Sequence, residues 1–211
     1  MNLVDLTLYL CTDRHWLGER TLAESVEQAI EGGVTLVQLR EKDVSTREFL
    51  DSAIEVQKVC RKYGVPFIVN DRIDIALAVD ADGVHVGQSD MPCAIARSML
   101  GPDKILGVSA SNLDHAKAAL EDGADYIGIG AAFMTDTKAG IKRAMTLDEI
   151  SVILENVDIP ACAIGGINEE TGLQLCGIGL DGISVISSIL ARPDITQAAR
   201  VMRDVAERIK G

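Results

Sequence analysis

The chain has 211 residues, of which 47% are hydrophobic and only 3% aromatic, and its formal net charge at pH 7 is −12. This charge argues against a nucleic-acid partner, which requires a basic patch. No stretch is long and apolar enough to cross a bilayer, and Met1–Asp5 lacks the basic start of a signal peptide, so we expect a cytoplasmic protein with no membrane partner.

Short aliphatic runs typical of β-strands recur along the chain, with helical patterns between them. The predicted strands are Thr7–Cys11, Leu36–Leu39, Phe67–Val69, Gly83–Val86, Ile105–Val108, Tyr126–Ile129, Ala161–Ile164 and Gly182–Ile186. Strands separated by helices indicate parallel βαβ units, and eight units in a chain of this length predict one α/β domain over residues 1–211, a (β/α)8 TIM barrel. An open flavodoxin-like sheet is the main structural alternative, but it typically has about five strands.

The helix ends carry signals of their own. Three helices are predicted to begin with a capping box, in which a hydroxyl residue is followed three positions later by a glutamate: Thr21 and Glu24, Ser45 and Glu48, Thr146 and Glu149. Glycines are predicted to end helical runs in the left-handed conformation, at 32–33, 64, 101 and 123.

The five cysteines are scattered and never form a C-x-x-C pair. A disulfide framework or a zinc site needs paired spacing, so we expect buried, reduced thiols.

Polar residues collect where the predicted strands end, which is where barrel enzymes build their active sites. Gln38, Arg40 and Lys42 alternate along and beyond the second strand, so they share one face and can project together into the barrel mouth. Two cations and an amide at this position suit an anionic ligand. The alternative is a solvated strand end with surface ion pairs.

Two carboxylates follow neighbouring strands. Asp71 comes after the third strand and Asp90 follows the fourth, where they can share a cation. Mg²⁺ commonly takes one or two carboxylates together with waters and phosphate oxygens. The alternative is that each aspartate caps a helix, since Asp90 precedes Pro92. With Arg40 and Lys42 nearby, we favour a site for magnesium and a diphosphate.

A second anion site is predicted across the barrel. Gly166 and Ser187 follow the seventh and eighth strands, whose loops frequently bind phosphate in barrels. The long polar loop over residues 131–140 is predicted to fold over the mouth as a lid, although a plain surface loop is the alternative.

Histidine offers little for acid–base catalysis. His85 is predicted to be a hydrogen-bonded core residue, His15 to be exposed in a loop, and His115 to lie on a helix surface. No Ser-His-Asp or Cys-His arrangement is recognisable.

Motifs in these regions match a known family in order along nearly the whole chain. They are QLREK at 38–42, NDR at 70–72, GVHVGQSD at 83–90, GVS at 107–109, YIGIGAAFMTDTK at 126–138, AIGGI at 163–167 and DGISVIS at 181–187. Together they resemble the thiamine-phosphate synthase family, also called thiamine-phosphate pyrophosphorylase. The resemblance implies a transferase that joins 4-amino-2-methyl-5-(diphosphooxymethyl)pyrimidine to a thiazole phosphate, giving thiamine phosphate and diphosphate by a dissociative mechanism.

The resemblance also implies a role for each matching residue. The pyrimidine diphosphate would bind residues 38–42 and three strand-end or loop residues, which are Gln38, Leu39, Arg40, Glu41, Lys42, Asn70, Ser109 and Lys138. Within this set, Gln38 and Ser109 would orient the aminopyrimidine, and Arg40, Lys42, Lys138 and Ser109 would be catalytic. The thiazole phosphate would contact Thr135, Asp136, Thr137, Gly166, Ile186 and Ser187. Asp71 and Asp90 would bind one Mg²⁺ as the cofactor.

One departure and two alternatives accompany the resemblance. The family commonly has prolines where this chain has Ala131 and Met134, which predicts weaker binding or slower turnover because the lid is less constrained. The alternatives are a thiazole tautomerase-like isomerase and a non-catalytic barrel that binds a phosphorylated ligand. The expected partners are the two small-molecule substrates, and homo-oligomer formation is left open.

Overall fold

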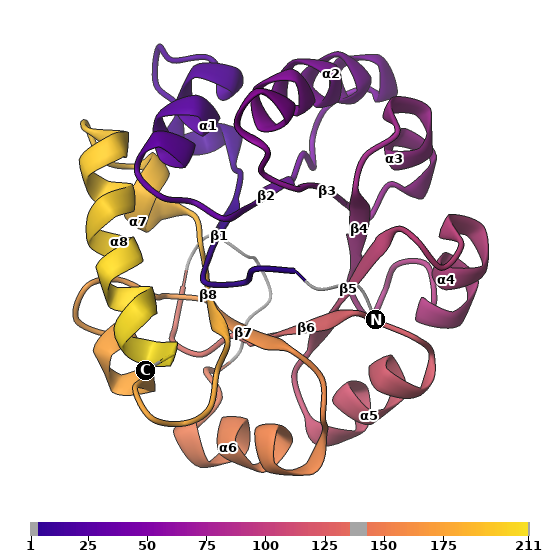
Figure 1. Cartoon of the computed structure of the whole chain (residues 1–211), viewed down its shortest axis with the longest axis vertical. Helices are drawn as coiled ribbons and strands as arrows, with labels where there is room; N and C mark the ends of the chain where they lie inside the picture. Colours follow the sequence, from indigo (N-terminus) through magenta and orange to yellow (C-terminus); the bar gives the residue numbers. More distant parts are fainter. Residues whose placement is uncertain (1–3, 136–142, 211) are drawn as a thin grey trace.

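The computed structural model describes residues 4–135 and 143–210. Within these ranges, eight parallel strands close into a barrel in chain order, and β1 pairs with both β2 and β8 (Figure 1). The strands are β1 (Leu8–Cys11), β2 (Leu36–Leu39), β3 (Phe67–Asn70), β4 (Gly83–Val86), β5 (Ile105–Ala110), β6 (Tyr126–Gly130), β7 (Ala161–Ile164) and β8 (Gly182–Val185). The predicted (β/α)8 fold is confirmed.

Helices surround the barrel and cover its outer surface (Figure 1). They are α1 (Leu22–Glu31), α2 (Thr46–Tyr63), α3 (Ile73–Val79), α4 (Cys93–Leu100), α5 (Leu113–Glu121), α6 (Leu147–Asn156), α7 (Ser187–Leu190) and α8 (Ile195–Lys210), with 3₁₀ turns η1 (Arg14–Trp16) and η2 (Gly172–Leu175). The interval between β7 and β8 holds η2 where a helix was predicted. Gly177 and Gly179 both have positive φ in this interval, which interrupts a helical path.

The helix starts follow their sequence signals. All three predicted capping boxes are present, at the starts of α1, α2 and α6. Gly64 ends α2 in the left-handed conformation as predicted. Gly33, Gly101 and Gly123 also have positive φ, but Gly32 is right-handed with φ −84°, so the reversal after α1 occurs at Gly33 alone.

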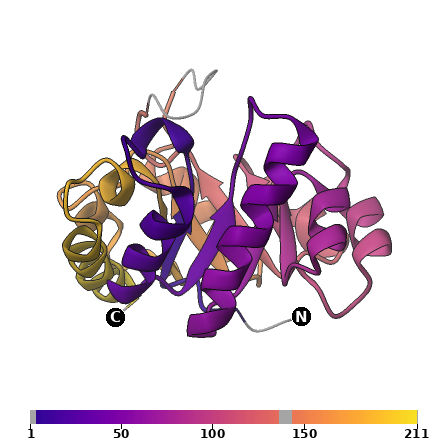
Figure 2. The same ribbon diagram turned by 90° about the horizontal axis from the view of Figure 1, so that it is seen from above.

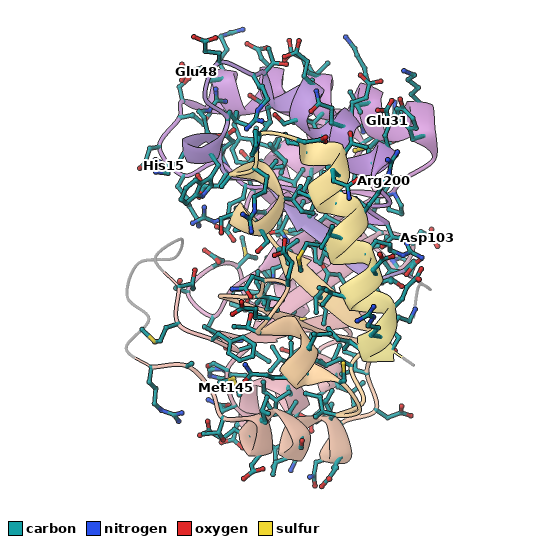
Figure 3. The ribbon with its side chains drawn as sticks, turned by 90° about the vertical axis from the view of Figure 1, so that its left-hand side faces the viewer. His15, Glu31, Glu48, Asp103, Met145 and Arg200 are labelled. Carbon is teal, nitrogen blue, oxygen red and sulfur yellow. The ribbon has the colours of Figure 1, made fainter. Side chains whose placement is uncertain are left out.

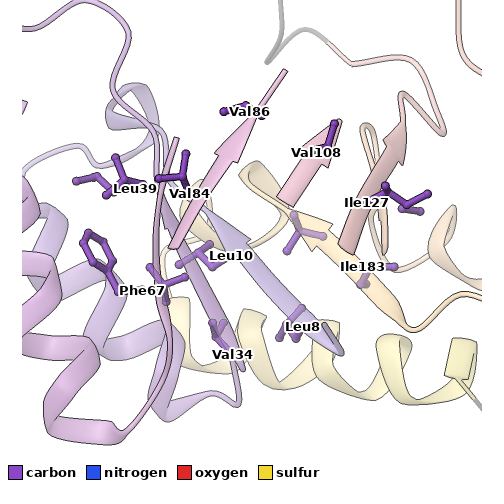
Figure 4. Close-up of a cluster of buried hydrophobic side chains, with 14 of the residues drawn as sticks. Leu8, Leu10, Val34, Leu39, Phe67, Val84, Val86, Val108, Ile127 and Ile183 are labelled. Carbon is purple, nitrogen blue, oxygen red and sulfur yellow. The ribbon is translucent and has the colours of Figure 1, made fainter. Parts of the chain in front are cut away.

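The apolar core has two parts because successive strand residues point to opposite faces. The larger part fills the space between the strands and the helices; Figure 4 shows members such as Leu10, Phe67 and Val84. The smaller part packs inside the barrel and consists of Leu6, Tyr9, Leu36, Ile68, Ile105, Tyr126 and Cys162. This inner cluster closes the barrel beneath its mouth, so the mouth is a cavity with a floor.

The strands all run toward one end of the barrel, where the loops that follow them form a rim (Figure 2). This arrangement brings the strand-end residues of distant sequence segments together. No helix in the described ranges combines the length and apolar composition that a membrane span requires.

Candidate active site

A cavity of about 560 Å³ opens at the carboxyl ends of the strands. The predicted site residues that line it are Gln38, Arg40, Lys42, Asn70, Asp71, Asp90, Ser109, Thr135, Gly166, Ile186 and Ser187. Asp136, Thr137 and Lys138 lie outside the described residues, as does the second half of the predicted 131–140 lid. The strand ends thus bring eleven of the predicted residues to one cavity.

Leu39 and Glu41 are placed elsewhere. The side chain of Leu39 is fully buried in the outer apolar core, and that of Glu41 pairs with Arg14 at 3.0 Å. Both alternate with the inward-facing residues of the same segment, so the period of two that directs Gln38, Arg40 and Lys42 inward directs these two away. Their side chains are therefore directed away from the cavity, so a substrate contact at these two positions would have to come from the backbone, and their assignment stays a prediction.

The two cations of this segment each contact a carboxylate. Arg40 Nη1 lies 3.2 Å from Asp13 Oδ2, and Lys42 Nζ lies 2.5 Å from Asp71 Oδ2. Asp13 was not predicted as part of the site, although its position just after the first strand is a signal that could have identified it. These pairs hold both cations at the rim, where an anionic ligand can reach them.

Asp71 and Asp90 do not cap helices. Asp71 has φ +60°, and the residue that caps α3 is Arg72, which makes no side-chain cap hydrogen bond. Asp90 accepts a hydrogen bond from the Gly87 N–H at 2.8 Å, and Pro92 stands at the N-cap of α4. The capping alternative is wrong for both aspartates. A left-handed backbone at a non-glycine residue is a strained conformation of the kind that clusters at functional sites.

The electrostatics of this pair favour a cation. Burial raises the pKa of Asp71, the Lys42 ammonium opposes that shift, and the neighbouring Asp90 carboxylate raises the pKa further. Among the described residues no group of three or more histidine, cysteine, aspartate or glutamate side chains converges on a point. Two carboxylates that repel one another suit an ion that takes its remaining ligands from water and phosphate, as Mg²⁺ does.

The floor of the cavity presents polar groups to the cavity. Tyr9, His85 and Ser109 line it, and Tyr126 lies directly beneath. His85 is buried, with Nδ1 3.0 Å from the Tyr126 hydroxyl and Nε2 3.0 Å from Ser109 Oγ. The prediction of a hydrogen-bonded core histidine is confirmed, but its position in the cavity wall was missed. Burial raises the pKa of Tyr9 and of Tyr126 well above the usual value, so both hydroxyls keep their protons.

The other two histidines lie at the rim. His15 is exposed on η1, as predicted, at the opposite end of the molecule from Asp103 (Figure 3). His115 is half-buried on α5, lines the cavity and lies 3.1 Å from Ser111 Oγ through Nδ1. The prediction that His115 lies on a helix surface is confirmed, but its place in the cavity lining was missed.

Two cysteines line the cavity, but neither is a reactive thiolate. Burial raises the pKa of Cys11 to about 12 and that of Cys162 to about 12. A protonated thiol is a poor nucleophile. Cys60 and Cys93 are also buried, whereas Cys176 is exposed, so the prediction of buried thiols holds for four of the five.

The opposite wall offers backbone and hydroxyl groups. Gly165, Gly166, Ile186 and Ser187 line it, and Gly166 has φ +63°. A Cβ at Gly166 would lie 2.5 Å from the Met134 carbonyl oxygen and 2.8 Å from Phe133 Cβ. Only glycine therefore lets the segment after β6 pack against the loop after β7, and this contact shapes the wall.

Ser184 has a buried hydroxyl in the cavity lining, and its Oγ has no hydrogen-bond partner among the described residues. We expect Ser184→Ala to raise the free energy of unfolding by about 1 kcal/mol, because it removes a buried polar atom that makes no compensating bond. Chemical denaturation of both proteins measures the difference.

Ser25 supplies the matched control. Its hydroxyl is equally buried but donates to the Thr21 carbonyl oxygen at 3.0 Å, so Ser25→Ala should lower stability. Equal losses in the two variants would contradict the argument for Ser184.

Comparison with known proteins gives a consistent result. The family model described as thiamine monophosphate synthase matches residues 8–189. A thiamine-phosphate synthase of Clostridium acetobutylicum is 53% identical over 99% of this chain and 98% of its own length, and one of Methanobrevibacter smithii is 52% identical over 90% of each. The solved structure of a thiamine phosphate pyrophosphorylase from Pyrococcus furiosus is 40% identical, covers 98% of both chains and has a TM-score of 0.88.

Proposed function

Because the chain belongs to the thiamine monophosphate synthase family, we infer that it is a transferase that condenses a pyrimidine diphosphate with a thiazole phosphate. The products are thiamine phosphate and diphosphate. The closed barrel and its mouth cavity supply the scaffold for this reaction, and the close structural relative has the same fold over its whole length.

The observation that supports the proposed site is that two sets of polar groups suited to anions lie on opposite walls of one cavity. Arg40, Lys42 and Asn70 come from the β2 and β3 side, whereas Gly166 and Ser187 follow β7 and β8. In a closed barrel of eight strands, β3 and β7 face each other across the axis. Two phosphorylated substrates bound to these walls would meet over the floor.

We propose that Asp71 and Asp90 hold one Mg²⁺ next to the diphosphate. The donor set fits, because both carboxylates line the cavity. Asp71 contacts Lys42, Asp90 accepts from the Gly87 N–H, and the pKa of Asp71 is raised partly by Asp90. When bound, the ion supplies Lewis-acid stabilisation of the charge that develops on the leaving oxygen.

The side chains on the β2 and β3 side of the cavity stabilise the same negative charge on the leaving diphosphate. Arg40 and Lys42 donate hydrogen bonds to the diphosphate, and Asn70 adds an amide donor, so negative charge on the departing group is stabilised where it forms. The bond between the methylene carbon and the diphosphate oxygen breaks, and the lone pair of the thiazole nitrogen forms the new carbon–nitrogen bond. Lys138, with Thr135 and Thr137, remains a proposed contact, and only Thr135 of these three lies in the described ranges.

This reaction requires no protein nucleophile and no general base. Among the described residues of the cavity, the thiols of Cys11 and Cys162 are protonated, and both ring nitrogens of His85 are engaged. The state of these three side chains therefore agrees with direct capture of an electron-deficient pyrimidinylmethyl carbon by the thiazole nitrogen.

The test is product formation by the purified protein. Supplied with both substrates, it should release diphosphate and thiamine phosphate with Mg²⁺ and lose this activity in excess EDTA, as followed by chromatography. Isomerisation of a thiazole carboxylate phosphate without coupling would indicate the tautomerase alternative. Tight binding of either substrate with no product would indicate a binding protein.

A further inference from the structure

Five side chains form a continuous hydrogen-bonded chain across the barrel floor. The Gln38 amide Nε2 donates to the Tyr9 hydroxyl, which lies 2.7 Å from the Tyr126 hydroxyl. Tyr126 lies 3.0 Å from His85 Nδ1, and His85 Nε2 lies 3.0 Å from Ser109 Oγ. We call this set the floor chain. Its ends, Gln38 and Ser109, line the cavity from β2 and β5.

The floor chain is held rigidly. Tyr9 and Tyr126 are almost completely buried, and their rings meet edge-on with centroids 5.8 Å apart. Gly107 pairs with both His85 and Tyr126 in the sheet, and a Cβ there would lie 2.1 Å from Tyr126 Cζ and 2.5 Å from His85 Nδ1. A glycine at this position is therefore what permits the tyrosine–histidine bond. Buried networks of this kind specify one arrangement, because an unpaired member is costly in a region of low dielectric.

The first bond determines the direction of every other bond. A hydroxyl has one proton to donate, and a neutral imidazole has one N–H and one acceptor nitrogen. Tyr9 accepts from Gln38, and its buried hydroxyl proton still needs an acceptor, which Tyr126 provides; the proton of Tyr126 in turn goes to His85 Nδ1. The imidazole proton is then on Nε2 and is donated to Ser109 Oγ.

This direction fixes what the two ends present to a ligand. Gln38 keeps its carbonyl oxygen as an acceptor, and Ser109 keeps its hydroxyl proton as a donor. A 4-aminopyrimidine matches both, because its amino group donates and its ring nitrogens accept. A 4-oxopyrimidine has the opposite pattern beside the same ring position, with an accepting oxygen and a donating ring N–H.

We propose that Tyr9, Tyr126 and His85 are positioning residues that make the site select a 4-aminopyrimidine over a 4-oxopyrimidine. This inference rests on the proposed function and on the family resemblance, which implies that Gln38 and Ser109 orient the aminopyrimidine. To accept the oxo ring, the Gln38 amide must turn over. Tyr9 must then donate to it, Tyr126 must donate to Tyr9, and the His85 proton must move to the other nitrogen. Binding the oxo form therefore requires every hydrogen bond of the floor chain to reverse its direction.

The test compares the dissociation constants of the amino and oxo forms of the pyrimidine diphosphate by calorimetry. Tyr126→Phe breaks the floor chain, so Tyr9 becomes free to donate to a turned Gln38 amide. We expect the preference for the amino form to fall about tenfold, which corresponds to the loss of roughly one hydrogen bond. Tyr9→Phe, which removes the acceptor of Gln38 itself, should give the same reduction and serves if Tyr126→Phe fails to fold.

Tyr63 provides the matched control, because it is an exposed tyrosine on α2 whose hydroxyl lies 3.0 Å from Glu27 and 3.0 Å from Glu31. Tyr63→Phe should leave the preference unchanged. If Tyr126→Phe weakened the binding of the amino and oxo forms equally, the inference would be overturned, because the floor chain would then contribute packing and not selectivity. A wild-type protein that binds both forms equally well would also overturn it. Absence of diphosphate release from the wild type would instead refute the proposed function, because the binding preference is measured without turnover.

Discussion

Replacing Asp71 by asparagine is expected to lower kcat for diphosphate release about a hundredfold, the order seen when one electrostatic contact to a developing charge is lost. The substitution keeps the shape of the side chain but removes the charge that faces Lys42 at 2.5 Å and shares the site with Asp90. A neutral amide holds a divalent cation weakly, so the variant should also need more Mg²⁺ to reach its half-maximal rate. Both quantities come from steady-state kinetics over a range of Mg²⁺ concentrations.

Asp103→Asn is the matched control, because Asp103 is exposed and lies at the far end of the barrel from the mouth (Figure 3). It makes the same change in net charge and should leave kcat and the Mg²⁺ dependence unaltered. A kcat for Asp71→Asn within about threefold of the wild type would contradict the proposal that Asp71 binds Mg²⁺.

The second large effect concerns stability. Asp125→Ala is expected to lower the free energy of unfolding by about 3 kcal/mol, because it leaves the charge of Arg97 without its partner. Asp125 is only 3% exposed, accepts from Arg97 Nη2 at 2.6 Å and also accepts from the Leu106 N–H at 2.9 Å. The pair ties α4 to the starts of β5 and β6, away from the cavity. Urea denaturation measures the loss.

An exposed ion pair shows what a surface contact contributes. Arg203 and Glu207 lie one turn apart on α8 with 2.8 Å between Nε and Oε1, so Glu207→Ala should change stability by less than about 1 kcal/mol. If Asp125→Ala costs no more than this control, the buried pair is not what joins α4 to the barrel.

The sequence predicted the strands and helix starts well because both depend on local signals. Capping boxes join residues three positions apart, and strand runs are read from consecutive aliphatic residues. The prediction failed between β7 and β8, where the chain forms only the short turn η2 among the described residues of that interval. Glycines at 177 and 179 are a local sequence signal for this interruption.

The candidate site was partly predictable for a similar reason. In a parallel barrel every strand ends at the same rim, so polar residues such as Arg40, Asp71 and Asp90 could be placed together without coordinates. The alternation of strand residues also directs the side chains of Leu39 and Glu41 away from the cavity. The place of His115 in the cavity lining was missed because it depends on how the start of α5 is oriented, and the pairing of Asp13 with Arg40 was missed because it joins residues from two different strand ends.

What the sequence by itself determined is the eight-strand barrel, the rim on which the polar residues lie, and the family to which their motifs belong. Only the tertiary structure decided which groups meet: Lys42 with Asp71, Arg40 with Asp13, and the floor chain from Gln38 to Ser109. The physical reason is barrel closure. Tyr9 and Tyr126 are 117 positions apart, and no local periodicity records that their hydroxyls share a bond inside a closed sheet.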